Sequence, residues 1–286
     1  MKQFRYILEA VLVWIAFAVF KIMGPDAASS AGGWLGRTVG PRLGASRKAR
    51  NNLKNAFPDM TDAEYDKTIH DMWDNLGRVF AEYPHLHDII YNKIEIVGME
   101  NLNKIGARSS FLAMGSHLAN WELFPFFMNY PANADSSCIY RIPNNPYVAW
   151  LLDRCRNPEE KAKYIPKSMA GTKDMVKTLQ AGGRISILID QKYNQGEAIE
   201  FFGRPAMTST SIAQLSLKFG IPILPIQIER LSGCRFRATV HPPLDTNGLD
   251  EKAIMLSAHH LLEDWIAKRP SQWLWLHRRW DSKALQ

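Results

Sequence analysis

From Lys93 onward, short apolar runs alternate with segments in which apolar residues recur at helical spacing. Such runs are typical of buried strands, and strands that alternate with helices pack as a sheet covered by helices. The predicted strands are residues 94–97, 110–114, 137–140, 185–189, 221–228 and 236–240. The predicted helices are residues 120–129, 145–154, 172–180, 209–219 and 249–268. The pattern predicts an α/β fold with a mixed, largely parallel sheet flanked by helices.

One further helix is expected upstream of this region. Thr61 and Glu64 have the spacing of a capping box, so a helix should begin after Thr61, and Pro84 should end it near Tyr83. Its apolar residues recur at helical spacing, which indicates core packing and not a cofactor site.

The N-terminal segment contains an unbroken apolar run, AVLVWIAFAVF, at residues 10–20, with Lys2 and Arg5 before it and Lys21 after it. Residues 6–23 would form a helix about 27 Å long, near the lower limit for crossing a bilayer. A buried core helix and a cleaved signal peptide are alternatives, but the basic flanks favour a retained anchor that spans the membrane or lies in its interface. We therefore expect an anchor at residues 1–24 and a single α/β domain with an N-terminal helical region at 25–286.

The chain is basic, with a formal net charge of +7. Such an excess indicates an acidic partner, namely nucleic acid, an anionic membrane surface or a phosphorylated substrate. Basic residues beside an apolar segment tend to stay in the cytoplasm and bind anionic lipids. They crowd after the predicted anchor, as Arg37, Arg42, Arg47, Lys48, Arg50 and Lys54. Three scattered cysteines, Cys138, Cys155 and Cys234, suit reduced thiols on the cytoplasmic side.

His117 and Glu122 are the candidate catalytic pair. Their H-x-x-x-x-E spacing alone says little, since 8 histidines and 28 acidic residues in 286 give about one such pair by chance. His259 and Asp264 repeat the spacing inside a predicted amphipathic helix, where side chains five positions apart point about 140° away from each other. His259 is therefore interpreted as an ordinary helix residue.

The context of His117 is different, because it follows a predicted strand and precedes a predicted helix. A turn at the carboxyl end of a strand is where α/β sheets place their sites, and it could fold the ring towards Glu122. A hydroxyl needs a base to take its proton during attack, and an imidazole held by a carboxylate suits that task. The alternative is a structural histidine hydrogen-bonded at a helix start.

Several blocks in order resemble those of bacterial lipid A late acyltransferases of the lauroyl/myristoyl type. SHLANWE at 116–122 resembles the H-x-G-N-W-E block of that family. The other similar blocks are RKARNNLKNAFPDMTDAEY at 47–65, YRIPNNP at 140–146, ILIDQ at 187–191, EFFGRPAMTSTS at 200–211 and PSQWLWLHRRW at 270–280. The resemblance covers nearly the whole chain, including the predicted anchor.

This resemblance implies a glycerolipid-acyltransferase-like fold and acyl transfer from acyl-carrier protein to a 3-hydroxyacyl chain of a phosphorylated lipid A precursor. It implies a location at the cytoplasmic face of the inner membrane and no metal or organic cofactor. By position, it makes His117 the general base and Glu122 its partner, and it matches Arg141 to an arginine of the family.

The residues themselves suggest further binding groups. Arg141, just past a strand end, could bind a phosphate or an oxyanion, or form a surface salt bridge. Asp190, also at a strand end, could organise the site or cap a turn. Gly203 and Arg204 could hold a phosphate near a helix N-terminus. In the last block, His277, Arg278 and Arg279 could be interfacial anchors beside Trp273, Trp275 and Trp280.

Two departures from the family pattern stand out: Ala119 replaces the usual glycine, and the segment after Arg154 is short and lacks an expected glycine. They leave the acyl-chain length and the donor open. The alternatives are a glycerolipid or lysophospholipid acyltransferase, which usually has N-H-x-x-x-x-D, and a non-catalytic basic lipid-binding protein on the membrane. Nucleic-acid binding is not expected, because no recognisable motif accompanies the charge.

Overall fold

The computed structural model describes residues 2–106, 109–157, 159, 163–167 and 169–280. Its centre is a seven-stranded sheet in the order β1-β9-β8-β2-β5-β3-β4. The strands are β1 (Ile94–Val97), β2 (Leu112–Gly115), β3 (Ser136–Tyr140), β4 (Lys163–Pro166), β5 (Arg184–Leu188), β8 (Ile223–Ser232) and β9 (Arg235–Val240). All neighbours pair in parallel except β8 and β9, which are antiparallel. The predicted mixed, largely parallel sheet is confirmed.

Alternate residues of the central strands enter two hydrophobic clusters, as expected for a sheet covered on both faces. Leu112 and Met114 of β2 belong to one cluster, whereas Ala113 belongs to the other. The first cluster contains residues of α9 (Met169–Gln180), α10 (Ser211–Phe219) and α11 (Glu251–Lys268). The second contains residues of α5 (Leu86–Asn92), α6 (Met99–Ile105) and α7 (Leu123–Asn129). The core thus lies on both sides of β2, the strand that precedes His117.

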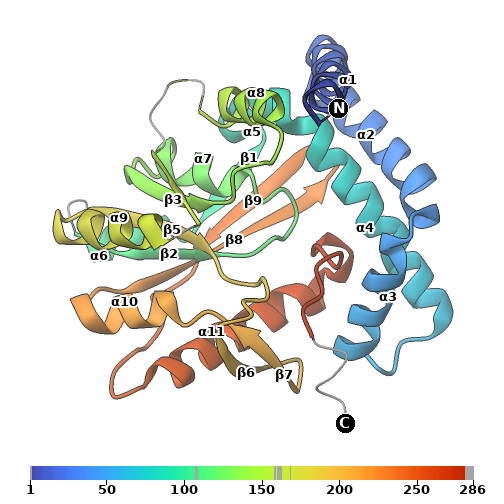
Figure 1. Cartoon of the computed structure of the whole chain (residues 1–286). Coiled ribbons are helices and arrows are strands. Elements are labelled where there is room, and N and C mark those ends of the chain that lie inside the picture. The colour runs from blue at the N-terminus through green and yellow to red at the C-terminus, as the bar shows by residue number, and fades with distance from the viewer. Residues whose placement is uncertain (1, 107–108, 158, 160–162, 168, 281–286) are drawn as a thin grey trace.

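The N-terminal helices gather along one side of the sheet (Figure 1). They are α1 (Lys2–Met23), α2 (Pro25–Val39), α3 (Ala45–Ala56) and α4 (Asp62–Glu82), with 3₁₀ turns η1 (Gly40–Arg42) and η2 (Tyr83–His85). The capping box is present at the start of α4, where Thr61 and Glu64 bond each other's backbone N–H. A Cβ added at Gly32 would lie 2.3 Å from the carbonyl oxygen of Gly77, so only glycine permits this approach of α2 to α4.

Helix α1 is the one described helix that is long and apolar enough to cross a membrane. Only Ala10, Phe17 and Phe20 are buried in it, and these pack towards the rest of the protein. Most of its other apolar side chains are exposed. The helix is therefore not a core helix.

The structure departs from the sequence-based expectation in two places near the site. A separate hairpin consists of β6 (Glu197–Phe201) and β7 (Arg204–Thr208). The helix expected from residue 120 begins later, at Leu123, because residues 116–122 form an irregular turn. Within that turn Leu118 bridges Trp273, just after η3 (Pro270–Gln272), and Ala119 adopts a φ of 51°.

Candidate active site

His117 lies at the carboxyl end of β2, as predicted, and faces Asp190 at the end of the neighbouring strand β5. Gly115 and Leu188 are paired in the parallel register, so the residues two positions further on meet at the same level. The Nδ1 of His117 donates to Oδ1 of Asp190 at 2.8 Å, and its backbone N–H donates to Oδ2 at 2.8 Å. The sheet register alone thus brings an imidazole and a carboxylate together.

Asp190 is buried and fully engaged. Its Oδ2 also accepts a hydrogen bond of 2.7 Å from the indole of Trp273, which is itself buried. Burial by itself raises the pKa of a carboxyl, but the charge of His117 and these hydrogen bonds outweigh it and lower the pKa of Asp190 to about 2. Asp190 is therefore ionised, which fixes the proton of the neutral imidazole on Nδ1 and leaves Nε2 as an acceptor.

The Nε2 of His117 faces Gln191 and His277. The amide nitrogen of Gln191 lies 3.0 Å from Nε2 of His117 and 3.2 Å from Nε2 of His277. Burial, followed by the charge of His117, lowers the pKa of His277, so this second imidazole is neutral near pH 7. The amide of Gln191 therefore donates to Nε2 of His117, the nitrogen that would accept a proton if His117 acted as a general base.

Glu122 lies beside the site but is bound to Arg156. Its carboxylate accepts bonds of 2.6 and 2.8 Å from Arg156 and one of 3.1 Å from the indole of Trp121. Burial raises the pKa of Glu122, yet Arg156 outweighs it and the pKa is lowered. The sequence predicted that Glu122 would pair with the ring of His117, but in the structure Asp190 bonds this ring. The sheet register places Asp190 beside His117, and α8 (Pro146–Arg156) places Arg156 beside Glu122.

The turn between β2 and α7 is held from both sides. The backbone N–H of Ala119 donates to Gln272, and that of Leu274 donates to the carbonyl of His117. The side chain of Asn120 donates to Glu82 at 2.8 Å. Because backbone bonds fix both neighbours of Leu118, the His117 ring has little freedom to leave Asp190.

Glu82 is buried and forms an ion pair with Arg230 at 2.5 Å. Arg230 also donates to Asn75, whose own amide donates to the carbonyl of Ala119. This network joins α4 and β8 to the turn that carries His117. Since leaving one partner of a buried pair alone is costly, the network favours a single conformation of the turn.

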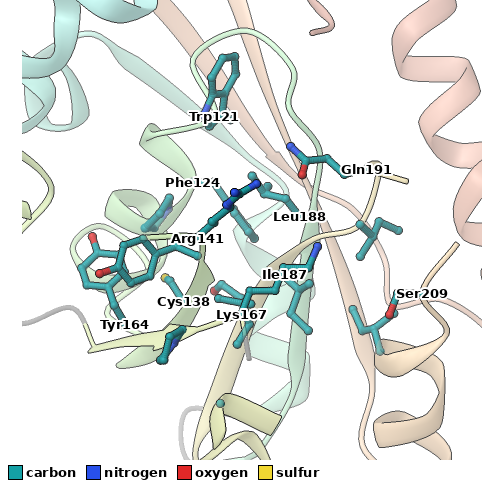
Figure 2. Close-up of a pocket in the computed structure, with 18 of the residues that line it drawn as sticks. Trp121, Phe124, Cys138, Arg141, Tyr164, Lys167, Ile187, Leu188, Gln191 and Ser209 are labelled. Atoms are coloured by element: carbon teal, nitrogen blue, oxygen red, sulfur yellow. The ribbon is translucent and has the colours of Figure 1, made fainter. Parts of the chain in front are cut away.

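A cavity of about 520 Å³ opens beside His117. Figure 2 shows side chains from the β2–α7 turn, the end of β3, strand β5 and the start of α10 around one hollow. Buried Cys138 and Met175 line its inner part, together with apolar residues of β5. Polar or basic residues of the lining that are more exposed include Arg141, Lys167, Gln191 and Tyr193. The cavity thus combines apolar wall residues with the buried Glu122–Arg156 ion pair and a polar, basic rim.

Of the other predicted binding residues, Arg141 lines the cavity. Gly203 and Arg204 do not line it; Gly203, with a φ of 68°, is in the turn of the β6–β7 hairpin, and Arg204 is the first residue of β7. The two residues predicted to bind phosphate at a helix N-terminus therefore lie at the far end of β7, one strand length from the start of α10.

Much of the C-terminal block is part of the core. Trp273, Trp275, Trp280 and Arg279 are buried. His259 is also buried, and its Nδ1 donates to the carbonyl of Glu200 at 2.6 Å. Burial, then the charge of Arg279, lowers the pKa of His259 to about 4. The interpretation of Arg279 as an interfacial anchor is therefore wrong, whereas His277 and Arg278 are exposed. His259 is a helix residue with a structural hydrogen bond.

Sequence reasoning missed three residues of the site. Gln191 directly follows Asp190, which the sequence already placed at the end of a strand. Gln191 could therefore have been predicted at the same edge of the sheet. Arg156 and Trp273 carried no such signal, because their contacts depend on how distant elements pack. Among the described residues, no group of three or more His, Cys, Asp or Glu side chains could hold a metal ion.

Comparison with known proteins gives a consistent result. A family model described as bacterial lipid A biosynthesis acyltransferase matches residues 1–282. The chain is 25% identical over 246 residues to the lipid A biosynthesis lauroyltransferase of Escherichia coli K12, covering 81% of this chain and 78% of that protein. It is 26% identical over 269 residues to a lipid A biosynthesis acyltransferase of Haemophilus influenzae, covering 88% and 82%. A solved 1-acyl-sn-glycerophosphate acyltransferase from Thermotoga maritima aligns at a TM-score of 0.41 and 14% identity, over 94% of this chain and 99% of that chain.

Proposed function

The chain belongs to the bacterial lipid A biosynthesis acyltransferase family, and on that premise we propose that it transfers a fatty acyl chain from acyl-carrier protein to a 3-hydroxyacyl hydroxyl of a lipid A precursor. The observation that carries this proposal is the ring of His117, whose Nδ1 donates to buried Asp190 while it lines an apolar cavity. An imidazole in this state has its second nitrogen free of a proton, as a general base requires.

In this mechanism the acceptor hydroxyl attacks the thioester carbonyl carbon of the donor directly. His117 takes the hydroxyl proton at Nε2, and Asp190 stabilises the imidazolium that forms. The tetrahedral intermediate then expels the thiolate, which leaves as a thiol with the proton from His117. No acyl-enzyme is needed, so no serine or cysteine nucleophile takes part.

Glu122 supports the site in a different way. Because it is bidentate with Arg156, it holds the end of α8 against the turn that carries His117. We therefore propose that Glu122 is a positioning residue and that Asp190, in place of Glu122, orients the imidazole of His117.

The cavity suits an acyl chain beside charged headgroups. Its walls include apolar side chains such as Met175 and Ile187, whereas Arg141 and Lys167 supply positive charge at the rim. Arginine binds phosphate in a bidentate manner, so Arg141 is the proposed contact for a phosphate of the acceptor. The same positive rim suits an acidic donor protein at the cytoplasmic face of the inner membrane, where α1 would attach the enzyme.

The test is transfer from acyl-carrier protein to a tetra-acylated lipid A precursor in detergent, with products identified by mass spectrometry. His117→Ala and Asp190→Asn should each lower the rate by on the order of 10³-fold with unchanged folding. His70→Ala, at an exposed position on α4, is the matched control and should keep full activity. Near-normal transfer by well-folded His117→Ala would refute the mechanism. Preferred acylation of a lysophospholipid offered in the same assay would refute the acceptor.

A further inference from the structure

Helix α8 lies against α1 and borders the cavity. Its N-cap residue Asn145 donates to the carbonyl of Tyr6 at 2.8 Å, and Trp150 stacks on Trp14 with ring centroids 5.2 Å apart. No residue of α8 is fully buried. Leu151, Leu152 and Cys155 pack one side of α8 against the core, whereas Tyr147 and Trp150 on the helix stay exposed. A helix on a soluble domain normally buries its apolar stripe and exposes polar residues elsewhere, so these two aromatic side chains indicate a further partner.

Exposed apolar residues of α8 adjoin those of α1, through Tyr147 and Trp150, and Ile142 is exposed four residues before α8. Ile142, Tyr147 and Trp150 are 51%, 43% and 50% exposed. Tyr147 closes an apolar groove of about 430 Å³ whose other walls are all on α1, formed by Ile7, Ala10, Val11, Trp14 and Ile15. A contiguous apolar surface of this kind, on a soluble protein, marks an interaction site.

Charge at the edge of this surface favours lipid as the partner. The guanidinium of Arg154 lies over the ring of Trp150 at 5.1 Å, and Lys2 and Arg5 lie over the ring of Tyr6, each at 5.6 Å. Aromatic rings with adjacent cations are the side chains that proteins place at the level of lipid headgroups, where anionic lipids attract the cations. The surface is also continuous with α1, the one described helix apolar enough for a bilayer.

Both ends of α1 are fixed to the protein. Near its start, Tyr6 and Trp14 contact the α8 region, and near its end the carbonyl of Phe20 accepts a 2.8 Å bond from His85 in η2. A helix that crossed the hydrocarbon core in this arrangement would draw α8 and η2, with their charged residues, into the core as well. That cost is large, so α1 should lie along the membrane surface.

We propose that the outer faces of α1 and α8 together form one docking surface that rests in the interface of a bilayer, with α1 in the plane of the membrane. Arg141, five residues before α8, and Arg156, at its end, both line the cavity. Docking of α8 therefore brings the cavity next to the lipid, so that an acyl chain reaches His117 from the membrane side.

The test measures the depth of fluorescent labels on the full chain in vesicles of phosphatidylethanolamine and phosphatidylglycerol. Labels are attached at Ile142→Cys and Tyr147→Cys in a Cys155→Ser background, since Cys138 and Cys234 are buried. Leu12→Cys reports on α1, and Leu217→Cys, at an apolar exposed position on α10, is the matched control. Nitroxide lipids with the quencher near the headgroup or deep in the chain report the depth.

Labels at 142, 147 and 12 should lose emission to the shallow quencher, whereas the label at 217 should not. Quenching at 12 by the deep probe alone, with labels at 142 and 147 as bright as that at 217, would show that α1 spans the membrane and α8 stays in water, and would overturn the proposal. Labels at 142 and 147 that resist both quenchers while the protein sediments as a dimer would assign the surface to a second copy. None of these readouts requires acyl transfer.

Discussion

The ring of His117 and the carboxylate of Asp190 are joined by two hydrogen bonds of 2.8 Å, one from Nδ1 and one from the backbone of the same histidine. The two residues are 73 positions apart and meet because β2 and β5 are parallel neighbours in register. A carboxylate held this firmly defines the tautomer of the imidazole. It also leaves Glu122, five residues from His117, available for Arg156.

Removing the Glu122 carboxylate should act mainly on stability. Glu122→Ala leaves Arg156 charged and largely buried without its partner, which costs about 3–5 kcal/mol of unfolding free energy. Removing both partners with Glu122→Leu and Arg156→Leu should restore most of that loss, because an apolar pair needs no counter-charge. Denaturant unfolding in detergent measures both effects.

The exposed ion pair of Arg237 and Glu95 is the control for this experiment. Glu95→Ala should leave the unfolding midpoint unchanged, since exposed pairs contribute little. A stable, inactive Glu122→Ala variant that the double substitution does not rescue would instead favour direct participation of Glu122 in the chemistry.

Asp190 predicts a loss of stability in acid. Its pKa is lowered to about 2 in the folded protein, below the value of about 3.9 in an unfolded chain. The stabilisation is therefore present above about pH 4 and is lost as the pH falls towards 2, an effect on the order of 2 kcal/mol. Unfolding free energies measured between neutral pH and pH 3 should fall less steeply for Asp190→Asn than for the wild type.

Asp174→Asn, at an exposed position on α9, is the matched control and should keep the wild-type slope. An Asp190→Asn variant with the same acid dependence as the wild type would contradict the proposed ionisation of this carboxylate.

Sequence patterns predicted the sheet well because buried strands appear as apolar runs whatever their order. β1 matches its prediction, and the ends of β2, β5, β8 and β9 differ by a few residues. β4 was missed because four residues, KYIP, contain too little periodicity. The order of the strands, which brings His117 to Asp190, is a property of packing that local patterns do not contain.

The same limit applies to the candidate site. His117 was found because a histidine after an apolar strand is visible in the sequence, and Ala119 was flagged because the family usually has glycine there. Its φ of 51° explains that preference, since glycine adopts this conformation at little cost. Arg279 was misassigned to a membrane interface because an aromatic and basic segment has the same composition in a core as at a membrane surface.

Gln191 should control access of the acceptor to the base. Its amide donates to Nε2 of His117, so an acceptor hydroxyl must displace it before proton transfer. Gln191→Ala should lower KM for the acceptor several-fold, whereas the turnover rate should change by less than about 10-fold, a smaller loss than a missing general base gives. Steady-state kinetics with saturating donor separate the two effects.

Replacing the other partner of the amide gives the comparison. His277→Ala removes the second acceptor of the Gln191 amide but leaves its bond to His117, so KM for the acceptor should change little. Turnover that falls by about two orders of magnitude in Gln191→Ala would contradict displacement and would indicate that the amide stabilises the oxyanion.

Deleting residues 1–24 should release the protein from membranes only in part and should also destabilise it. Phe17 and Phe20 are buried against Phe80 and Tyr83, and burial of two such rings is worth about 3–6 kcal/mol. The truncated chain should therefore unfold at a lower denaturant concentration. Phe17→Ala combined with Phe20→Ala in the full chain should show a similar loss of stability while its exposed apolar face keeps it on membranes. A truncated chain as stable as the full one would show that α1 is an independent anchor, because the packing of its inner face would then contribute nothing to the fold.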